Sequence, residues 1–376
     1  MTCIEIIKYL EDWAPKEIAW QNDNAGIQVG RSNNKVKNIM LSLELTTDVV
    51  KQAILKNCNF IITHHPLIFQ PIKKLNLNNE PNAKLIEKLI KNEITLFSAH
   101  TNLDFAKHGV SFQLAKKLGL QNISFLKNLK SNQFKVSVFV PETHIEKVAS
   151  SIFSAGGGVI GEYSNCSFRS PGEGTFKGSS VSKPVVGSKQ KYEKVNEVKL
   201  EILIDSWKLN NILSAIRTSH PYEEPAYDIY PLENYNSNFG AGAIGILENE
   251  LSVSQTLSLI LEKLGAKNLK YVLGNQSKIK KIAVCGGSGS DLLSDAINCG
   301  ANAFVTADIK YHTFQSAQNK ILLIDAGHYE TEIHVLNELQ RRLKKFVRMK
   351  NNIKILKFNG NTNPINFYNK TRRYVN

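Results

Sequence analysis

Residues 61–69 read Ile61-Ile62-Thr63-His64-His65-Pro66-Leu67-Ile68-Phe69. The apolar run over residues 59–63 predicts a buried parallel strand, and Pro66 prevents that strand from continuing. Successive side chains on a strand point to opposite faces, but the backbone turns at the strand's carboxyl end. His64 and His65 can therefore both face the crevice in which open α/β sheets bind ligands. Two loop histidines with no shared role are the alternative for this motif taken alone.

The size and composition of the chain indicate a soluble globular protein with more than one domain. It has 376 residues, of which 42% are hydrophobic and 21% charged, so we expect two or three folded domains. No apolar run is long enough to span a bilayer, and the first residues lead into an amphipathic helix rather than a signal peptide. The five cysteines are scattered without CxxC spacing, which predicts free thiols and a cytoplasmic location.

Strand and helix patterns alternate around the histidine pair. Strands are predicted over residues 36–45 and 94–99, and a helix over residues 82–92. This alternation predicts an α/β fold with a parallel sheet and right-handed crossovers. The strand at 94–99 leads into His100 and Asp104, so two strand ends bring imidazole and carboxylate groups to one crevice. Zn, Mn, Fe and Ni accept such ligands, although His100 can instead orient a ligand or shuttle protons.

A His/Glu pair follows the last predicted strand, residues 321–324. His328 and Glu332 are four residues apart, so they share one face of a helix that begins at Gly327. Glu330 would point about 200° away from His328 and is the weaker candidate. Five protein ligands exceed what one catalytic zinc takes, so two divalent metal ions sharing a bridging carboxylate are predicted. The predicted metal ligands are His64, His65, Asp104, His328 and Glu332.

A separate α+β domain is predicted over residues 131–236, between core segments 1–130 and 237–376. Two β-α-β patterns on an antiparallel sheet are typical of a ferredoxin-like fold. His220, Glu223 and Glu224 form either a second polar site or, because prolines flank them, a rigid loop. The predicted strands are residues 134–140, 159–169, 197–205 and 220–230, and the predicted helices are residues 141–155 and 207–218.

Two glycine-rich segments occur in the second half of the chain. Residues 240–245 are expected to lead back into the α/β pattern of the core. Residues 286–291 follow a predicted strand and precede a helix, an arrangement in which backbone N–H groups can cradle an anion. This second segment lacks the Lys of a Walker loop and the full dinucleotide-binding spacing, so a tight turn is the alternative.

The net charge of +14 is concentrated at the carboxyl end. Residues 336–376 contain eleven Lys and Arg residues against Glu338 alone, which accounts for +10 of that charge. Such a segment can contact nucleic acid or an acidic partner, and a solvated basic helix face is the alternative. The basic residues are Arg341, Arg342, Lys344, Lys345, Arg348, Lys350, Lys354, Lys357, Lys370, Arg372 and Arg373.

These motifs together are similar to those of a known family. The chain resembles the GTP cyclohydrolase 1 type 2 homologues, the NGG-interacting-factor-three-like group of dinuclear-metal proteins, in the longer form that carries an inserted domain. Glu44 stands where that pattern has Asp, and Ala307 where Gly is usual before Asp308. The matching stretches, spread over nearly the whole chain, are residues 23–30, 63–69, 98–104, 220–225, 285–291, 308–312 and 327–332.

The resemblance implies a site, an assembly and an insert of known kind. The five predicted ligands fall on the metal positions of the family, with Glu332 as the bridge between two ions. The family also implies a hollow homohexamer and an insert resembling PII- or CutA-like proteins. The extra methylene of Glu44 is expected to affect substrate geometry more than metal binding.

The resemblance further implies a metal-dependent hydrolase that directs an activated water at a nucleotide-like substrate. If the family name describes the chemistry, the target is the purine imidazole ring of GTP. His100 or His312 would act as the general acid or base. The alternatives are a metal-dependent binding or regulatory protein that acts through its insert, and a phosphoesterase acting on nucleic acid.

Overall fold

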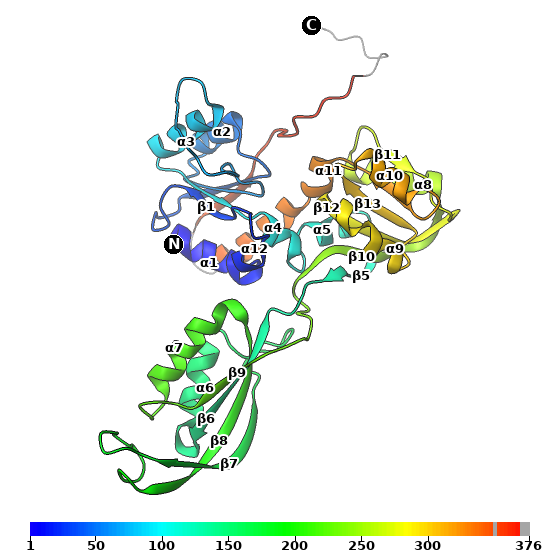
Figure 1. The fold of residues 1–376 in the computed structure, drawn as a ribbon. Coiled ribbons are helices and arrows are strands. Elements are labelled where there is room, and N and C mark those ends of the chain that lie inside the picture. The colour runs from blue at the N-terminus through cyan, green and yellow to red at the C-terminus, as the bar shows by residue number, and fades with distance from the viewer. Residues whose placement is uncertain (349–351, 369–376) are drawn as a thin grey trace. The chain divides into compact units, whose positions relative to one another are not determined.

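The computed structural model describes residues 1–348 and 352–368, and these form two compact units (Figure 1). Unit 1 combines Met1–Lys127 with the described residues from Phe239 onward, and unit 2 is Asn128–Asn238. The insert predicted over residues 131–236 falls inside unit 2. Unit 1 contains two sheets and unit 2 contains one, so the chain has a mixed α/β fold with three sheets.

The first sheet of unit 1 carries the histidine pair. Its strand order is β1-β4-β3-β2-β15, with β1 antiparallel to β4 and the other neighbours parallel, as predicted for the central strands. The strands are β1 (Gly26–Val29), β2 (Asn38–Ser42), β3 (Phe60–Thr63), β4 (Thr95–Ser98) and β15 (Lys354–Lys357).

Helices cover both faces of this sheet. Ile39 and Leu41 of β2 pack in one core with the first and last long helices, whereas Met40 packs on the opposite side. This alternation follows the period of two in a strand, and burial on both faces explains why the strands are almost wholly apolar. The helices are α1 (Cys3–Trp13) and α12 (Val335–Arg348) on one face and α2 (Thr47–Leu55) and α3 (Pro81–Lys91) on the other, with the short η1 (Lys16–Ile18) after α1.

The second sheet of unit 1 has the order β11-β14-β13-β12-β10-β5. Its centre, β12 to β14, is parallel, whereas β10 runs antiparallel to β12 and β11 runs antiparallel to β14. The strands are β5 (Gln121–Asn128), β10 (Gly240–Ser252), β11 (Lys270–Val272), β12 (Lys278–Ser288), β13 (Ala303–Ala307) and β14 (Leu322–Asp325). The helices after β10, β12 and β13 are α8 (Val253–Leu264), η4 (Ser290–Leu292) with α9 (Leu293–Asn298), and α10 (Tyr311–Ala317).

The glycine-rich residues 240–245 belong to strand β10 rather than leading up to one. Glycines remove the alternation of apolar side chains by which a strand is recognised, so the pattern gave no signal here. Close packing favours glycine at position 245, because a Cβ there would lie 2.9 Å from the Cβ of Leu120 on the neighbouring segment.

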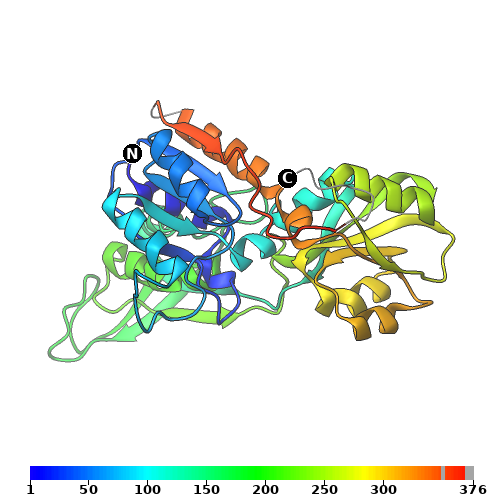
Figure 2. The same cartoon turned by 90° about the horizontal axis from the view of Figure 1, so that it is seen from above.

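Short helices lie between the two sheets of unit 1 (Figures 1 and 2). They are α4 (Thr101–Phe105), α5 (Val110–Lys117) and α11 (His328–Glu332). α5 contacts β12, β10 and α12, and α11 contacts β12, β13 and α5. Because α4 follows β4 of the first sheet and α11 follows β14 of the second, these two helices begin at the carboxyl ends of strands from both sheets. The predicted metal ligands lie at this junction.

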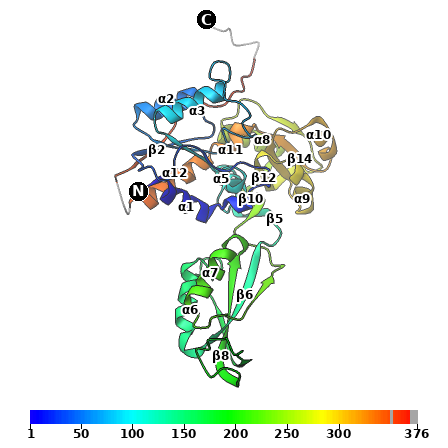
Figure 3. The same ribbon diagram turned by 60° about the vertical axis from the view of Figure 1, so that its left-hand side comes forward.

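Unit 2 has the sequence order β-α-β-β-α-β of the ferredoxin-like pattern. Its sheet has the order β7-β8-β6-β9, and both helices cover one face (Figure 3). The strands are β6 (Gln133–Pro141), β7 (Phe168–Lys177), β8 (Tyr192–Asp205) and β9 (Tyr227–Pro231). The helices are η2 (Glu142–His144) with α6 (Ile145–Ser154), and η3 (Ser206–Lys208) with α7 (Leu209–Ser219).

Two predicted strands of unit 2 were placed wrongly. The strand predicted over 159–169 begins only at Phe168, and the strand predicted over 220–230 begins only at Tyr227. β7 is an edge strand that is exposed over most of its length, so it lacks the apolar alternation that marks a half-buried strand. The prolines before β9 hold residues 220–226 in a loop instead.

The basic carboxyl segment begins as the amphipathic helix α12. Its apolar face is buried, and Glu338 accepts hydrogen bonds from Arg341 and Arg342. The guanidinium of Arg342 also lies 4.0 Å from the ring centroid of Trp13. Two of the eleven basic residues, Arg341 and Arg342, are therefore engaged within the fold. Lys350, Lys370, Arg372 and Arg373 lie outside the described residues.

Two general expectations can be compared with the structure. All five cysteines are free, as predicted. Among the described residues, the helices are too short or too polar to cross a membrane.

Candidate metal centre

The backbone at the end of β3 directs His64 and His65 to the same side. The amide N–H groups of both residues donate to the carbonyl of Leu43, at 3.1 and 2.9 Å. Two consecutive residues that share one partner interrupt the alternation of the strand, as in a β-bulge. The imidazole centroids consequently lie 4.8 Å apart, which confirms that this strand end gathers both rings.

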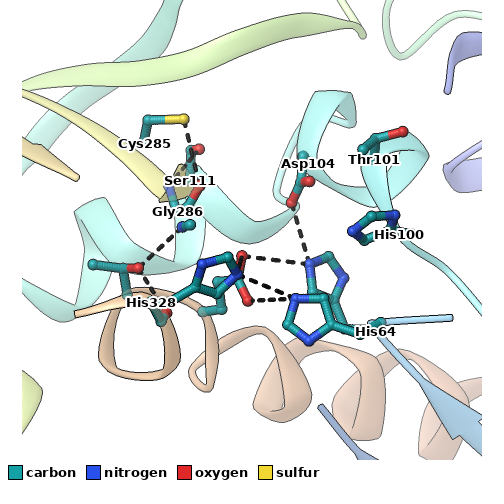
Figure 4. A network of polar contacts seen from close by, with 12 residues as sticks. His64, His100, Thr101, Asp104, Ser111, Cys285, Gly286 and His328 are labelled. Atoms are coloured by element: carbon teal, nitrogen blue, oxygen red, sulfur yellow. Dashed lines mark hydrogen bonds and ion pairs between the residues drawn. The ribbon is translucent and has the colours of Figure 1, made fainter. Parts of the chain in front are cut away.

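His64 is fully buried and faces two carboxylates (Figure 4). Its Nδ1–H donates to the carbonyl of Ala99 at 2.8 Å, which leaves Nε2 as the free lone pair. That Nε2 lies 3.5 Å from Oδ1 of Asp104 and 3.7 Å from Oε1 of Glu332. Asp104, which follows β4, and Glu332, which follows β14, thus meet at Nε2 of His64, which follows β3.

His65 and His328 form the other half of the cluster. Their Nε2 atoms lie 3.3 Å apart, and each is 3.1 Å from an oxygen of Glu332. Because Nδ1 of each ring faces a carboxylate and donates its proton there, both Nε2 atoms carry lone pairs, so a cation, either a proton or a metal ion, is needed between them. Glu332 contacts the histidines of both halves and therefore lies between them.

Carboxylates hold the outer nitrogens of these two rings. Nδ1 of His65 pairs with Oε1 of Glu44 at 3.1 Å, and Nδ1 of His328 pairs with Oδ2 of Asp308 at 2.6 Å. Such partners fix the tautomer and direct Nε2 inward, as around metal-bound histidines. Glu44 therefore contacts a candidate ligand directly, and its second oxygen accepts from Thr362. The sequence reasoning did not assign this role to Glu44 or Asp308, because neither is near its histidine in the chain.

Two glycine positions place Glu332 and His328. Gly327 has φ 90°, a conformation that glycine adopts without strain, and α11 begins at His328, one residue later than predicted. At Gly287 a Cβ would overlap Oε1 of Glu332, so only glycine lets the carboxylate lie against β12. Glu330 does not join the cluster and accepts from the side chain of Asn363 instead.

The anion-cradle hypothesis for residues 286–291 is wrong for their glycine amides. The N–H of Gly286 donates to Ser111, that of Gly287 to Thr331 and that of Gly289 to Thr306, at 2.9 to 3.3 Å. These donors are used inside the fold and cannot hold an anion. The glycines serve close packing against Glu332, which is nearer to the tight-turn alternative.

The structure brings one of the two predicted acid/base histidines to the cluster. The ring of His100 lies 5.4 Å from that of His64 and 5.5 Å from that of His65. Its Nδ1 pairs with Asp23 at 2.7 Å. His312 is exposed on α10, where its described contacts are Gln315 and the neighbouring Tyr311.

The electrostatics of the cluster favour additional positive charge. Burial disfavours protonation of His65 and His328, but Glu332 together with Glu44 or Asp308 outweighs it and raises the pKa to about 10 for His65 and about 9 for His328. Burial opposes ionisation of Glu332 as well, yet the surrounding histidines hold its pKa well below its ordinary value. For Asp104, burial prevails and raises the pKa to about 6. Without metal, protons would occupy the positions that a cation takes.

The donor set fits divalent transition-metal ions. Nε2 of His64 and Oδ1 of Asp104 are buried without a hydrogen-bond partner in the described part of the chain, which is costly unless something binds them. Imidazole and carboxylate are the ligands that Zn, Mn, Fe and Ni accept. Ligand atoms also lie within 4.8 Å of one another in two groups, His64 with His65 and His100, and His65 with His328 and Glu332. Both groups could bind a metal ion.

Comparison with known proteins agrees with this fold. The model of the family Duf34/NIF3 (NGG1p interacting factor 3) matches residues 1–364. A Bacillus subtilis protein named GTP cyclohydrolase 1 type 2 homolog is 36% identical over 366 residues, which cover 96% of this chain and 98% of that protein. A homologue of the same name from Halalkalibacterium halodurans is 33% identical over 365 residues, or 96% of this chain and 98% of its own.

Solved structures show the same architecture. The crystal structure of a Bacillus cereus protein related to NIF3 superposes with a TM-score of 0.85 at 37% identity, covering 98% of this chain and 99% of that one. A Staphylococcus aureus protein gives a TM-score of 0.78 at 30% identity with the same coverage. Fold and site define a three-sheet α/β protein with a histidine-rich candidate metal centre. The chain belongs to the Duf34/NIF3 family.

Proposed function

We propose that this protein is a metal-dependent hydrolase whose centre holds two divalent ions. The observation that carries the proposal is the convergence of three imidazole Nε2 atoms on Glu332, each with its Nδ1 held by an oxygen. A metal-free structural cluster has no need for three inward-facing nitrogen lone pairs. Zn, Mn, Fe and Ni remain equivalent candidates, because all accept these ligands.

The five ligands divide into two sets around one carboxylate. His64 and Asp104 would hold one ion, His65 and His328 the other, and Glu332 would bridge them. This division uses every predicted ligand and leaves room on each ion for water and substrate. His100 is near enough to the first set to serve as an additional ligand.

His100 is the residue best placed to move a proton. When bound, a pair of divalent ions supplies Lewis acidity that makes water a nucleophile near neutral pH. The Nδ1–H of His100 donates to Asp23, so Nε2 is the nitrogen that accepts or delivers a proton at the site. Asp23 itself is fixed by the backbone N–H and the hydroxyl of Thr101, at 3.1 and 2.5 Å. His312 has no comparable position.

The substrate we propose is a nucleotide or a similar small molecule. Its support is the name GTP cyclohydrolase 1 type 2 homolog carried by the relatives, which makes the purine ring of GTP the first candidate. A homohexamer and a cytoplasmic location are part of the proposal. Family membership supports the homohexamer, and the five free thiols support the cytoplasmic location.

A metal-dependent binding or regulatory protein is the second candidate. Its support is a ligand-sized cavity in unit 2, the ferredoxin-like insert that the family expectation likened to PII- or CutA-like proteins. A phosphoesterase acting on nucleic acid has less support, because Arg341 and Arg342 are paired with Glu338.

Metal content and turnover together test the hydrolase. We expect purified protein to contain about two divalent ions per chain, and His65→Ala to lose at least one of them together with turnover on a panel of nucleotides. His144→Ala is the matched control, since His144 belongs to unit 2 and lies outside the cluster. Unchanged turnover in His65→Ala would refute the metal-water mechanism. Metal binding without any turnover would favour the second candidate, a metal-dependent binding or regulatory protein.

A further inference from the structure

A cavity of about 510 Å³ lies entirely within unit 2. Val136, Val138 and Val140 of β6 point into the core under α6 and α7, so Phe139 points to the face that the helices leave open. The remaining walls come from β7 and β8, from the loop between them, and from the loop between α7 and β9. A cavity of this volume accommodates a ligand of about nucleoside size.

Aromatic rings and one carboxylate form the inner wall of the cavity. Phe139, Phe176 and Tyr222 line it together with Glu197, and all four are half-buried. The hydroxyl of Tyr222 is buried without a partner in full hydrogen-bond geometry among the described residues. Burial and then the nearby Glu197 raise the pKa of Tyr222 above its usual range, so this phenol stays neutral.

The carboxylate of Glu197 has no cationic partner. Ion pairs in the described part of the chain include its strand neighbour Glu201, which binds Lys199 at 2.9 Å, but none includes Glu197. Gly174 on β7 leaves space for it, because a Cβ there would overlap the Glu197 carboxylate. The neighbour of this carboxylate is the neutral Tyr222 hydroxyl, so its negative charge is available to a cation that enters the cavity.

Hydrogen bonds of His220 tie the loop of residues 220–226 to the cavity wall. His220 is buried, its Nε2 contacts the carbonyl of Phe139 at 2.9 Å, and its Nδ1 accepts from the N–H of Tyr222 at 3.0 Å. His220 therefore fixes the Tyr222 ring at the cavity wall. Glu223 and Glu224 are exposed at the rim of the same cavity.

The charge distribution selects the class of ligand. The exposed lining contains two lysines, Lys177 and Lys183, and the two rim glutamates, so its formal charge is balanced. The inner wall carries only the negative charge of Glu197. We propose that this cavity is a binding site for a small organic cation with a flat aromatic body, whose amine pairs with Glu197 while its ring packs against Phe139 and Phe176.

Tryptamine and indole-3-acetate test this proposal, because they share a ring and differ in the sign of their charge. Isothermal titration of the full-length protein should show saturable binding of tryptamine at one site per chain, with a Kd below about 1 mM. Indole-3-acetate should bind at least about tenfold more weakly. Absence of saturable tryptamine binding, or equal binding of the acid, would overturn the proposal.

Glu197→Gln removes the charge and keeps the shape of the side chain. It should weaken tryptamine at least about tenfold, whereas Glu173→Gln, an exposed change on β7 outside the cavity lining, should leave the Kd within about twofold. Phe139→Leu is the second variant and should also weaken binding. Circular dichroism checks that each variant is folded. If folded Glu197→Gln binds tryptamine as tightly as the unmodified chain, the site is not the one proposed. The metal centre plays no part in this experiment.

Discussion

Hydrogen bonds at their Nδ1 atoms hold the three histidine rings of the cluster in place. Ala99, Glu44 and Asp308 each contact one Nδ1, so each ring is held with Nε2 inward. The histidines themselves were predictable, because they follow strand ends in the sequence. Their partners were not, since Glu44 lies 21 residues from His65 and Asp308 lies 20 residues from His328.

Removal of a carboxylate that holds the Nδ1 of a histidine should weaken metal binding, although no metal ligand is removed. For Glu44→Ala we expect a loss of about 10- to 100-fold in metal affinity, because the His65 ring is no longer held. Titration against a competing chelator measures this change. Asp48→Ala, an exposed change on the neighbouring helix α2, should leave the affinity unaltered. Equal affinities in both variants would show that Glu44 does not orient His65.

Asp23 should contribute to stability in a pH-dependent manner. Burial opposes its ionisation, but hydrogen bonds from His100 and Thr101 lower its pKa from 3.8 to about 2. A depressed folded-state pKa adds stability above the unfolded value, and this contribution is lost as the pH falls towards 2. Asp23→Asn should therefore cost about 2 kcal/mol at pH 6 and much less at pH 2.5. Urea denaturation of both proteins at the two pH values measures this, and a cost independent of pH would contradict it.

Among the elements, those with a periodic apolar pattern were predicted and those without one were not. β2, β3 and β4 are apolar on both faces, and Thr46 caps α2 by accepting from the N–H of Val49. The exposed edge strand β7, the glycine-containing β10 and the four-residue β15 carry no such pattern. Apolar periodicity in the sequence reflects the burial of side chains. Elements that pack little side-chain surface therefore cannot be predicted from it.

The position of the Glu332 carboxylate should depend on Gly287 of β12. Gly287→Ala adds a Cβ that overlaps Oε1 of Glu332 at a position with φ 62°, so we expect a loss of about 2 kcal/mol of stability and displacement of the bridging carboxylate. Thermal unfolding and metal analysis measure the two effects. Gly172→Ala is the control, because nothing lies within 4 Å of the added atom and its φ is not positive. A metal-replete Gly287→Ala protein would contradict the packing role.

The candidate centre requires segments from both ends of the chain. His64, His65 and Asp104 precede unit 2 in the sequence, and His328 and Glu332 follow it. No local motif contains the whole site, so its assembly was predictable only from the convergence of strand ends and from family resemblance. Oligomeric state, metal identity and substrate are not encoded in such local patterns.

Unit 2 should be removable without loss of the metal centre. Gly240 packs directly against Phe125 and Lys127 at the end of β5, so a short turn can join the two segments of unit 1. We expect a variant in which a Gly-Ser turn replaces residues 129–238 to fold and to bind metal, and to lose tryptamine binding. Circular dichroism, metal analysis and calorimetry test the three parts. A folded variant without metal would show that unit 2 supports the centre.

Anomalous diffraction from crystals of the metal-loaded protein tests the central claim most directly. Data collected above and below the absorption edge of the bound metal should show two peaks about 3.5 Å apart, one beside His64 and Asp104 and one beside His65 and His328, on either side of Glu332. A map without peaks among these five side chains, or with its peaks elsewhere in the protein, would contradict the dinuclear centre.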